Sequence, residues 1–410
     1  MTIQHVAIID TTLREGEQFA SAHFTTAQKQ TIARALDRFG VAAIEITNPA
    51  ASPRSFADAR LLAAMPRRAM LLAHIRCTPD DVQAAIDAGV DGVNLFYGMS
   101  DHLRTHSHGH SIATMTTCAA QCIRLARDHG LVVRFSSEDG FRTDWDDLLA
   151  MYRAVDALGV DRIGIADTVG IATPRQVEEL VATLRRECRA AIEFHGHNDS
   201  GCAIANAHAA LDAGATFIDT TVLGIGERNG ITPLGGLIAR LYATDPALTA
   251  AYDLPGLRHL DALVAAIVGV PIPFNNYLTG SAAFTHKAGV HTKAVLADPC
   301  TYEILDPAVF GVERTIAVAH ALTGRAAIAD RARTLGLTFD AETIRAVTAE
   351  VKRRADDAPL TDADVDDLLQ SWTNAPPSPV GKPGALRVDG GSGPQAEAYA
   401  TEGVTYGYAG

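Results

Sequence analysis

Long apolar runs, basic tracts and signal-peptide features are absent from this sequence of 410 residues, and each absence excludes a class of protein. No apolar stretch reaches the roughly 18 residues that a membrane-spanning helix requires, so no membrane partner is expected. The formal net charge is −13 without any basic run, which argues against nucleic acid as a partner. The N-terminus MTIQHVAIIDTTLREGE has no charged region followed by an apolar stretch, and we expect no signal peptide.

Cysteine and lysine are also scarce. The six cysteines are scattered and form no CxxC pair, so we interpret them as reduced thiols of a cytoplasmic protein. Cys118 and Cys122 lie one helical turn apart and could bind metal, but packing in the core is the interpretation that we favour. Arginine supplies nearly all of the basic charge, which is typical of a high-GC bacterial genome.

Short apolar, β-branched runs recur along the first part of the chain, and each is followed by a segment of helix length. Their spacing of roughly 20–40 residues is that of a βα unit. Continuous apolar runs suit parallel strands that are covered on both faces. The expected strands lie at residues 5–11, 41–47, 70–75, 92–98, 132–138, 162–168, 191–197 and 217–224.

Eight such units in succession predict an α/β fold, a (β/α)8 TIM barrel followed by a small, mostly helical C-terminal region. A doubly wound sheet is the alternative, but eight similar units favour closure. Helices are expected at 257–270, 319–335, 341–355 and 361–372, the last with a capping box of Thr361 and Asp364. The expected divisions are a catalytic barrel (1–255), a linker or lid subdomain (256–316), a helical subdomain (317–373) and a disordered tail (374–410).

Ionisable residues collect where the expected strands end, which is where TIM barrels carry their active sites. Residues two apart on a strand point to one face, as do His195 and His197, and likewise Arg134, Ser136 and Glu138. An apolar interior would not hold so many ionisable groups at one end without a ligand. Other strand ends carry Arg14, Glu15, Glu45, His74, Arg76, Asp167 and Thr168.

The His195–His197 pair suits a divalent metal ion, because two imidazoles on one strand face supply adjacent coordination positions. Glu15 at a neighbouring strand end can supply a third ligand and leave positions open for substrate and water. Two hydrogen-bonded histidines at the barrel mouth are the alternative, but the acidic residues at other strand ends favour the metal. A further tract contains His102, His106, His108 and His110. We expect it to be a mobile βα loop, and a second metal site is the alternative.

Two charged groups admit either a structural or a ligand-binding role. Arg14 beside Glu15 is either an ion pair or a cation that steadies negative charge developing on a substrate oxygen. Loops after the eighth strand often bind phosphate, so the loop GIGERNG is weak support for a CoA-type ligand. A salt-bridge network and an anion cradle are the two interpretations of Arg134, Ser136, His74 and Arg76.

A series of motifs, in order along the chain, carries a family resemblance. The chain resembles the homocitrate synthase branch of the DRE-TIM metallolyases, close to isopropylmalate synthases, from about residue 8 to about residue 372. The RE of the first motif and the LTG at 322–324 favour that branch. The motifs are DTTLREGEQ (10–18), ITNPAASP (46–53), HIRC (74–77), RFSSEDGFRTD (134–144), DTVGIATP (167–174), HGHNDSGCAIANA (195–207), GIGERNGITPLGG (224–236) and FTHKAGVHTKA (284–294).

The resemblance implies a role for each matching residue. One divalent ion, Mn2+ or Mg2+ with Zn2+ as a further candidate, would be bound by Glu15, His195 and His197. Arg14 would stabilise the developing oxyanion. The 2-oxo acid would be held by His74, Arg134, Ser136 and Thr168. Acid–base chemistry would fall to His291, Glu138 and Tyr302, and because relatives are domain-crossing homodimers, His291 would reach a partner's barrel mouth.

The implied activity is a Claisen-type condensation of acetyl-CoA with a 2-oxo acid that bears a distal anionic group, releasing CoA and a 2-hydroxy acid. The candidate acids are 2-oxoglutarate, oxaloacetate and phosphonopyruvate. The last would make the chain a 2-phosphonomethylmalate synthase of phosphonate antibiotic biosynthesis. Three departures from the family pattern leave the acid open, namely Thr78 in place of histidine, His110 in place of lysine and Gly140 in place of threonine.

Two more distant functions remain as alternatives. A carbon–carbon lyase similar to hydroxymethylglutaryl-CoA lyase would carry a cysteine in the glycine-rich loop, and residues 224–236 contain none. A non-catalytic metabolite sensor would not need the intact set of Glu15, His195, His197 and His291. We expect no C-terminal regulatory domain of the isopropylmalate synthase kind.

Overall fold

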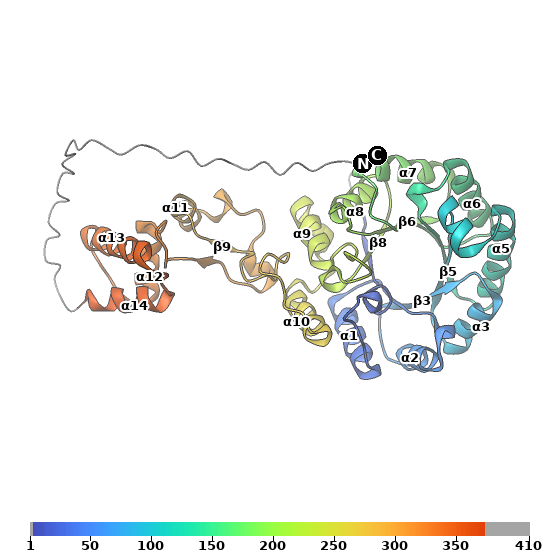
Figure 1. Cartoon of the computed structure of the whole chain (residues 1–410), viewed down its shortest axis with the longest axis horizontal. Coiled ribbons are helices and arrows are strands. Elements are labelled where there is room, and N and C mark those ends of the chain that lie inside the picture. Colours follow the sequence, from blue (N-terminus) through green and yellow to red (C-terminus); the bar gives the residue numbers. More distant parts are fainter. Residues whose placement is uncertain (1–2, 374–410) are drawn as a thin grey trace, which may run out of the picture.

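The computed structural model of the chain describes residues 3–373 and contains a closed barrel of eight parallel strands (Figure 1). Neighbouring strands pair in sequence order and β8 returns to β1, so the predicted TIM barrel is confirmed. The expected tail over 374–410 lies outside the described residues. The strands are β1 (Ala7–Asp10), β2 (Ala43–Ile46), β3 (Met70–Arg76), β4 (Gly92–Gly98), β5 (Val132–Glu138), β6 (Arg162–Asp167), β7 (Ala191–Gly196) and β8 (Phe217–Thr220).

Helices surround the barrel on its outside (Figure 1). Capping boxes at Thr25 and Thr173 start α1 and α7 by satisfying backbone N–H groups that have no partner within the helix. The histidine tract expected to be a mobile loop is instead helical in part, with a short α4 followed by a π-helical turn at Arg104–His108. The helices are α1 (Thr26–Phe39), α2 (Pro53–Ala63), α3 (Pro79–Ala88), α4 (Asp101–Leu103), α5 (Ile112–Asp128), α6 (Trp145–Ala157), α7 (Pro174–Glu187), α8 (Ala203–Asp212) and α9 (Leu234–Thr244).

The barrel interior is apolar at one end and charged at the other. Ile9, Ala43 and Leu72 fill its amino-terminal end, where Met70 and Phe217 pack against them. Above this layer the inward positions are polar and fully or almost fully buried. Since buried charges need partners, this layer has to be internally compensated. It comprises Glu45, Asn94, Arg134, Arg162, Glu193 and Asp219.

The region after the barrel contains a second, separate core. Helix α10 (Leu257–Val268) packs against α1 and shares the barrel's apolar core, although the division at residue 255 assigns α10 to the linker. The short strands β9 (Thr285–His286) and β10 (Thr315–Ile316) pair with each other, and α11 (Gly289–Ala297) lies between them in sequence. The second core is formed by Val318 and by α12 (Arg325–Thr334), α13 (Ala341–Asp357) and α14 (Asp362–Ser371).

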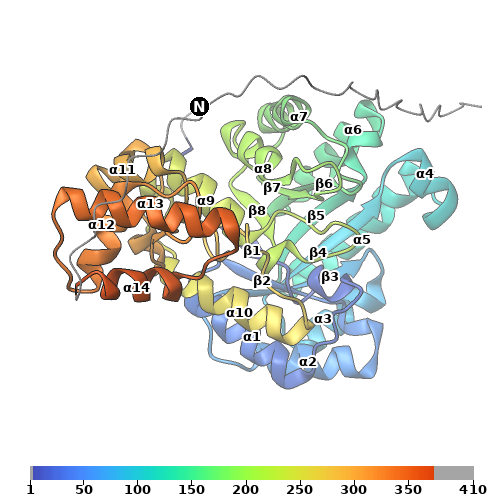
Figure 2. The same ribbon diagram turned by 60° about the vertical axis from the view of Figure 1, so that its left-hand side comes forward.

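The helices α11 to α14 form a group of their own to one side of the barrel, beyond β9 (Figure 1 and Figure 2). The helix expected at 319–335 begins only at Arg325, because Gly324 is extended and the His320 ring accepts the Leu322 N–H. The capping box of Thr361 and Asp364 is confirmed. The four-part division of the chain stays a prediction.

Two further expectations concern membranes and thiols. No described helix is long and apolar enough to cross a bilayer. All six cysteines are free. Cys122 is fully buried in the main core, which agrees with the expected role in packing. Cys118 packs against the same core and is partly exposed, so these two thiols serve packing.

Gly164 in β6 provides the space in which Arg134 crosses the barrel interior. A Cβ atom at Gly164 would lie 2.5 Å from the Arg134 guanidinium, too close for either group to stay in place. We therefore expect Gly164→Ala to reduce the free energy of unfolding by roughly 1–3 kcal/mol, as overpacking does. Denaturant titration measures this, with Gly235→Ala in α9 as the control, and a midpoint equal to that of the unsubstituted protein would contradict the placement of Arg134.

Candidate active site and metal centre

One cavity of about 210 Å3 opens at the carboxyl-terminal mouth of the barrel. The barrel residues to which the family resemblance assigns a role all line this cavity, namely Arg14, Glu15, His74, Arg134, Ser136, Glu138, Thr168, His195 and His197. Sequence reasoning did not place the remaining lining residues there, which are Gln18, Phe96, Ala166, Glu227 and Arg228. Closure of the barrel therefore brings residues from seven different βα connections and strand ends to one cavity.

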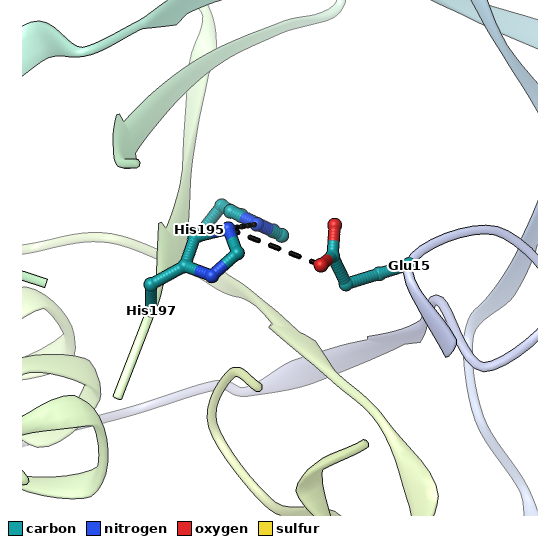
Figure 3. A group of neighbouring side chains, drawn as sticks. All are labelled: Glu15, His195 and His197. Carbon is teal, nitrogen blue, oxygen red and sulfur yellow. Dashed lines mark hydrogen bonds and ion pairs between the residues drawn. The ribbon is translucent and has the colours of Figure 1, made fainter. Parts of the chain in front are cut away.

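Glu15, His195 and His197 converge at one side of this cavity (Figure 3). One ligand atom from each lies within 4.8 Å of the others, a spacing that one cation could bridge. The Nε2 atoms of the two imidazoles are 3.4 Å apart, and the His197 Nε2 lies 4.0 Å from the Glu15 Oε1. Among the described side chains this is the one group of three that could hold a metal ion.

The protonation states of these three groups suit a cation. Burial, with the nearby positive charge of Arg14, lowers the pKa of His195 to about 3, and burial beside His195 lowers the pKa of His197 to about 3. Burial alone would raise the pKa of Glu15, but Arg14 and the two imidazoles outweigh it and hold that pKa at about 2. Neutral imidazoles and an ionised carboxylate are the forms that bind metal.

A hydrogen bond behind the metal group selects the imidazole tautomer. The Nδ1–H of His195 donates to the Asp219 Oδ2 at 2.9 Å, which leaves the His195 Nε2 lone pair directed at the cavity. The His197 Nδ1 is buried and has no hydrogen-bond partner among the described residues. The first of these observations fits a divalent ion at the Nε2 atoms of the two rings.

Arg14 and Glu45 form the next contact along the mouth. The Arg14 Nε donates to the Glu45 Oε1 at 2.7 Å, and its Nη1 bonds the Glu15 Oε2. Burial alone would raise the pKa of Glu45, but the positive charges of Arg14 and Arg134 outweigh it and hold that pKa well below its usual range. Arg14 therefore forms ion pairs with Glu15 and Glu45, and it also lines the cavity as a cation.

Arg134 lies in a network of buried carboxylates as well as on the cavity wall. Only 2% of its side chain is exposed. Its nitrogens lie 2.8 Å from the Glu193 Oε1, 3.4 Å from the Asp219 Oδ2 and 3.9 Å from the Glu45 Oε2. The two interpretations of Arg134 from sequence are therefore compatible, because a guanidinium with three acidic neighbours can still face a ligand.

Arg76 does not join the cradle that the sequence suggested. Its guanidinium makes two bonds of 2.8 Å to Asp81 in the first turn of α3, and 64% of its side chain is exposed. The predicted cradle at the cavity thus consists of His74, Arg134 and Ser136 without Arg76.

The glycine-rich loop after β8 supports the metal group. The backbone N–H of Glu227 donates to the Glu15 Oε1 at 2.9 Å, and a Cβ at Gly226 would lie 2.8 Å from that oxygen. Arg228 closes the loop over the mouth through Asp199 and through a bond of 2.6 Å to the Thr168 carbonyl. The structure shows this loop in contact with Glu15, and its binding of a CoA-type ligand stays a prediction.

His291 and Tyr302 lie outside the cavity. Their rings are in contact, with centroids 4.2 Å apart. His291 is exposed on α11, which Figure 1 shows beyond β9 on the side away from the barrel strands. Within one chain these two residues are therefore not brought to the barrel mouth.

None of the three departures from the family pattern lines the cavity. Thr78 caps α3 by accepting the Asp81 N–H. His110 is exposed before α5, and Gly140 packs behind β5, where a Cβ would meet the Ser137 hydroxyl at 3.2 Å. All three lie outside the cavity lining, and the open choice of 2-oxo acid expected from them stays a prediction.

An eight-stranded βα barrel with a carboxylate and two imidazoles at its carboxyl-terminal mouth defines a class of barrel enzymes that act through a divalent ion. The family model of HMGL-like proteins matches residues 5–264, and the model described as homocitrate synthase post-HMGL domain-like matches residues 278–359. The chain belongs to the homocitrate synthase family.

Relatives support this membership across almost the whole chain. The mitochondrial homocitrate synthase of Schizosaccharomyces pombe is 52% identical over 371 residues, which cover 90% of this chain and 89% of the relative. The cytosolic isozyme of Saccharomyces cerevisiae is 50% identical over 371 residues, covering 90% and 87%. The structure of hydroxymethylglutaryl-CoA lyase from Pseudomonas aeruginosa (TM-score 0.60, 22% identity, 72% of this chain and 99% of the other) shares the fold.

Substitution of His195, or of Asp219, which accepts the hydrogen bond from the His195 Nδ1, tests the metal centre. We expect His195→Ala to abolish retention of Mn2+ while the barrel still folds, because one of the three ligands is lost. Asp219→Asn should weaken Mn2+ binding about 10- to 100-fold, since the partner that orients His195 loses its charge. Calorimetric titration with Mn2+ and circular dichroism measure both effects.

The matched control is Asp261→Asn, which alters a buried aspartate that bonds Asn276 and Thr279 away from the cavity. This variant should bind Mn2+ as the unsubstituted protein does. Normal Mn2+ affinity in His195→Ala would overturn the assignment of the ligands.

Proposed function

We propose that this chain condenses acetyl-CoA with 2-oxoglutarate, releasing CoA and a tertiary 2-hydroxy acid, homocitrate. The observation that carries the proposal is identity of 50–52% to homocitrate synthases over nine-tenths of the chain. The cavity of about 210 Å3 is lined by three arginines and two hydroxyl side chains besides three glutamates, and its arginines suit a small dianionic acid.

We assign the metal ligands as Glu15, His195 and His197, and Mn2+ or Mg2+ as the ion, with Zn2+ as a further candidate. Such an ion, when bound, would polarise the keto group of the acid and so make C2 electrophilic. Arg14 stands beside Glu15 with its guanidinium held by Glu45, so it is placed to stabilise negative charge that develops on the former keto oxygen.

The 2-oxo acid would be held by side chains on the opposite arc of the mouth. Arg134 supplies a fixed positive charge, and its position is set by buried carboxylates rather than by the ligand. Ser136 and Thr168 add hydroxyl groups from the ends of β5 and β6, and His74 adds an imidazole from β3. This preformed set favours an acid with two anionic groups.

The methyl group of acetyl-CoA must lose a proton before a carbon–carbon bond forms to C2 of the acid. We propose Glu138, at the end of β5, as a base on the cavity wall, with His291 and Tyr302 completing the acid–base set. The former keto oxygen takes up a proton, and water then cleaves the thioester to release CoA. That hydrolysis makes the sequence irreversible.

The position of His291 leads us to propose a homodimer in which each C-terminal region reaches the partner's barrel mouth. The segments that carry the His291–Tyr302 pair also carry large exposed apolar side chains, which isolated chains rarely leave uncovered when they gather in a patch. The exposed fractions are 76% for Val290, 81% for Ile304 and 65% for Leu322. We also propose a cytoplasmic location, which free thiols favour.

Release of the CoA thiol tests the substrate directly. With acetyl-CoA and Mn2+, Mg2+ or Zn2+, we expect 2-oxoglutarate to give a kcat/KM at least about tenfold above those of oxaloacetate and phosphonopyruvate, because the spacing of its two carboxylates suits the preformed cavity. Exhaustive chelation should abolish the release. A preference for phosphonopyruvate would replace the proposal with 2-phosphonomethylmalate synthesis, and binding without thiol release would indicate a sensor.

Mixing two inactive variants tests the shared active site. His195→Ala disables the barrel and His291→Ala disables the C-terminal region. If sites combine two chains, subunit exchange should restore about a quarter of the normal activity, since half of the dimers are mixed and each has one intact site. A mixture of His291→Ala with Tyr302→Ala is the control and should stay inactive. No recovery in the first mixture would rule out crossing.

A further inference from the structure

Asn94 lies between two functional side chains in the buried polar layer of the barrel. It is the direct neighbour of His74 across the β3–β4 pairing. Its Nδ2 atom lies 2.8 Å from the Glu45 Oε2 and 2.8 Å from the His74 Nδ1. Asn94 itself is fully buried, so both contacts take place without water competing for them.

The charge on Glu45 fixes which way the Asn94 amide faces. Glu45 is flanked by Arg14 at 2.7 Å and Arg134 at 3.9 Å, and as a carboxylate it can only accept hydrogen bonds. An amide oxygen turned toward it would be repelled, so the NH2 group must face Glu45. One of the two N–H bonds then points to Glu45 and the other to the His74 Nδ1.

The second N–H bond decides the tautomer of His74. Because the His74 Nδ1 accepts a hydrogen bond, it carries no proton, and a neutral ring then has its proton on Nε2. Burial and the positive charge of Arg14 lower the pKa of His74, in agreement with a neutral ring. Phe96 stacks on the ring with centroids 4.3 Å apart and planes 15° apart, so the ring plane is fixed as well.

We propose that Asn94 is a positioning residue that fixes His74 as the Nε2–H tautomer, so that the ring presents a donor to an oxygen of the bound 2-oxo acid. This proposal rests on the proposed function for its ligand. The carboxylate and keto oxygens of such an acid are all acceptors, so a ring with its lone pair turned outward would repel them. Asn94 thereby favours ligands whose polar atoms at this point are oxygen acceptors.

If Asn94 had a purely structural role, its loss should have the same effect as the loss of another equally buried asparagine. The comparison is Asn206 in α8, which is equally buried and donates through its Nδ2 to the Ala172 carbonyl. Like that of Asn94, its Oδ1 has no partner among residues 3–373. Replacement of either amide by leucine removes the same groups, but only Asn94→Leu removes the contacts with His74 and Glu45.

The first experiment reads the tautomer in the intact protein, without any substrate. Nitrogen NMR of protein with 15N-labelled histidine, with His74 assigned by the loss of its signals in His74→Gln, should show a proton on Nε2 and none on Nδ1. Asn94→Leu should show a mixture of both tautomers, and Asn206→Leu the unchanged single form. A proton on the His74 Nδ1 in the unsubstituted protein would overturn the proposal.

The second experiment measures the dissociation constant of 2-oxoglutarate by calorimetry with the Mn2+-loaded protein. Asn94→Leu should raise it about tenfold, the usual effect of losing a hydrogen bond to a charged group, and Asn206→Leu should leave it unchanged. In a His74→Ala background, Asn94→Leu should cause no further rise, because its effect passes through the ring.

An equal rise in the presence and absence of His74 would contradict the proposal. Absence of any 2-oxoglutarate binding would contradict the proposed function instead, and the NMR result would still decide the tautomer. The two failures are therefore distinguishable.

Discussion

The carboxylate of Glu45, buried at the centre of the barrel, holds the polar groups of the mouth in their positions. It accepts the Arg14 Nε at 2.7 Å and the Asn94 amide at 2.8 Å, and it faces Arg134 at 3.9 Å. A buried charge is tolerated only when partners compensate it, and removal of one partner leaves the remaining buried charge with an uncompensated desolvation cost. The contacts that set the geometry of the site therefore also stabilise the barrel interior.

The same network prepares the metal group. Arg14 keeps Glu15 ionised, and Asp219 holds His195 in the tautomer whose lone pair faces the cavity. The loop after β8 completes the arrangement, because only glycine at position 226 lets its backbone approach Glu15. Ligands that are already deprotonated and oriented lose little freedom when a cation arrives, which favours tight and specific binding.

In the proposed homodimer, the C-terminal region would contribute to function through its position on the partner's barrel. Its helices have their own core, so it can keep its shape without packing against the strands of the barrel. The exposed pair of His291 and Tyr302, with exposed apolar side chains on the same segments, is typical of a surface that a second chain covers. In the proposed homodimer, folding of the barrel and completion of its acid–base set are separate events.

Local pattern in the sequence was sufficient for the eight strands, the barrel class and the shared strand face of His195 and His197, because strand spacing and side-chain alternation depend on near neighbours in the chain. Only the tertiary structure paired Arg76 with Asp81, placed His291 away from the mouth and set Asn94 beside His74. Those placements depend on strand register, helix placement and barrel closure, even for Arg76 and Asp81, which are only five positions apart. Local periodicity carries no information about them.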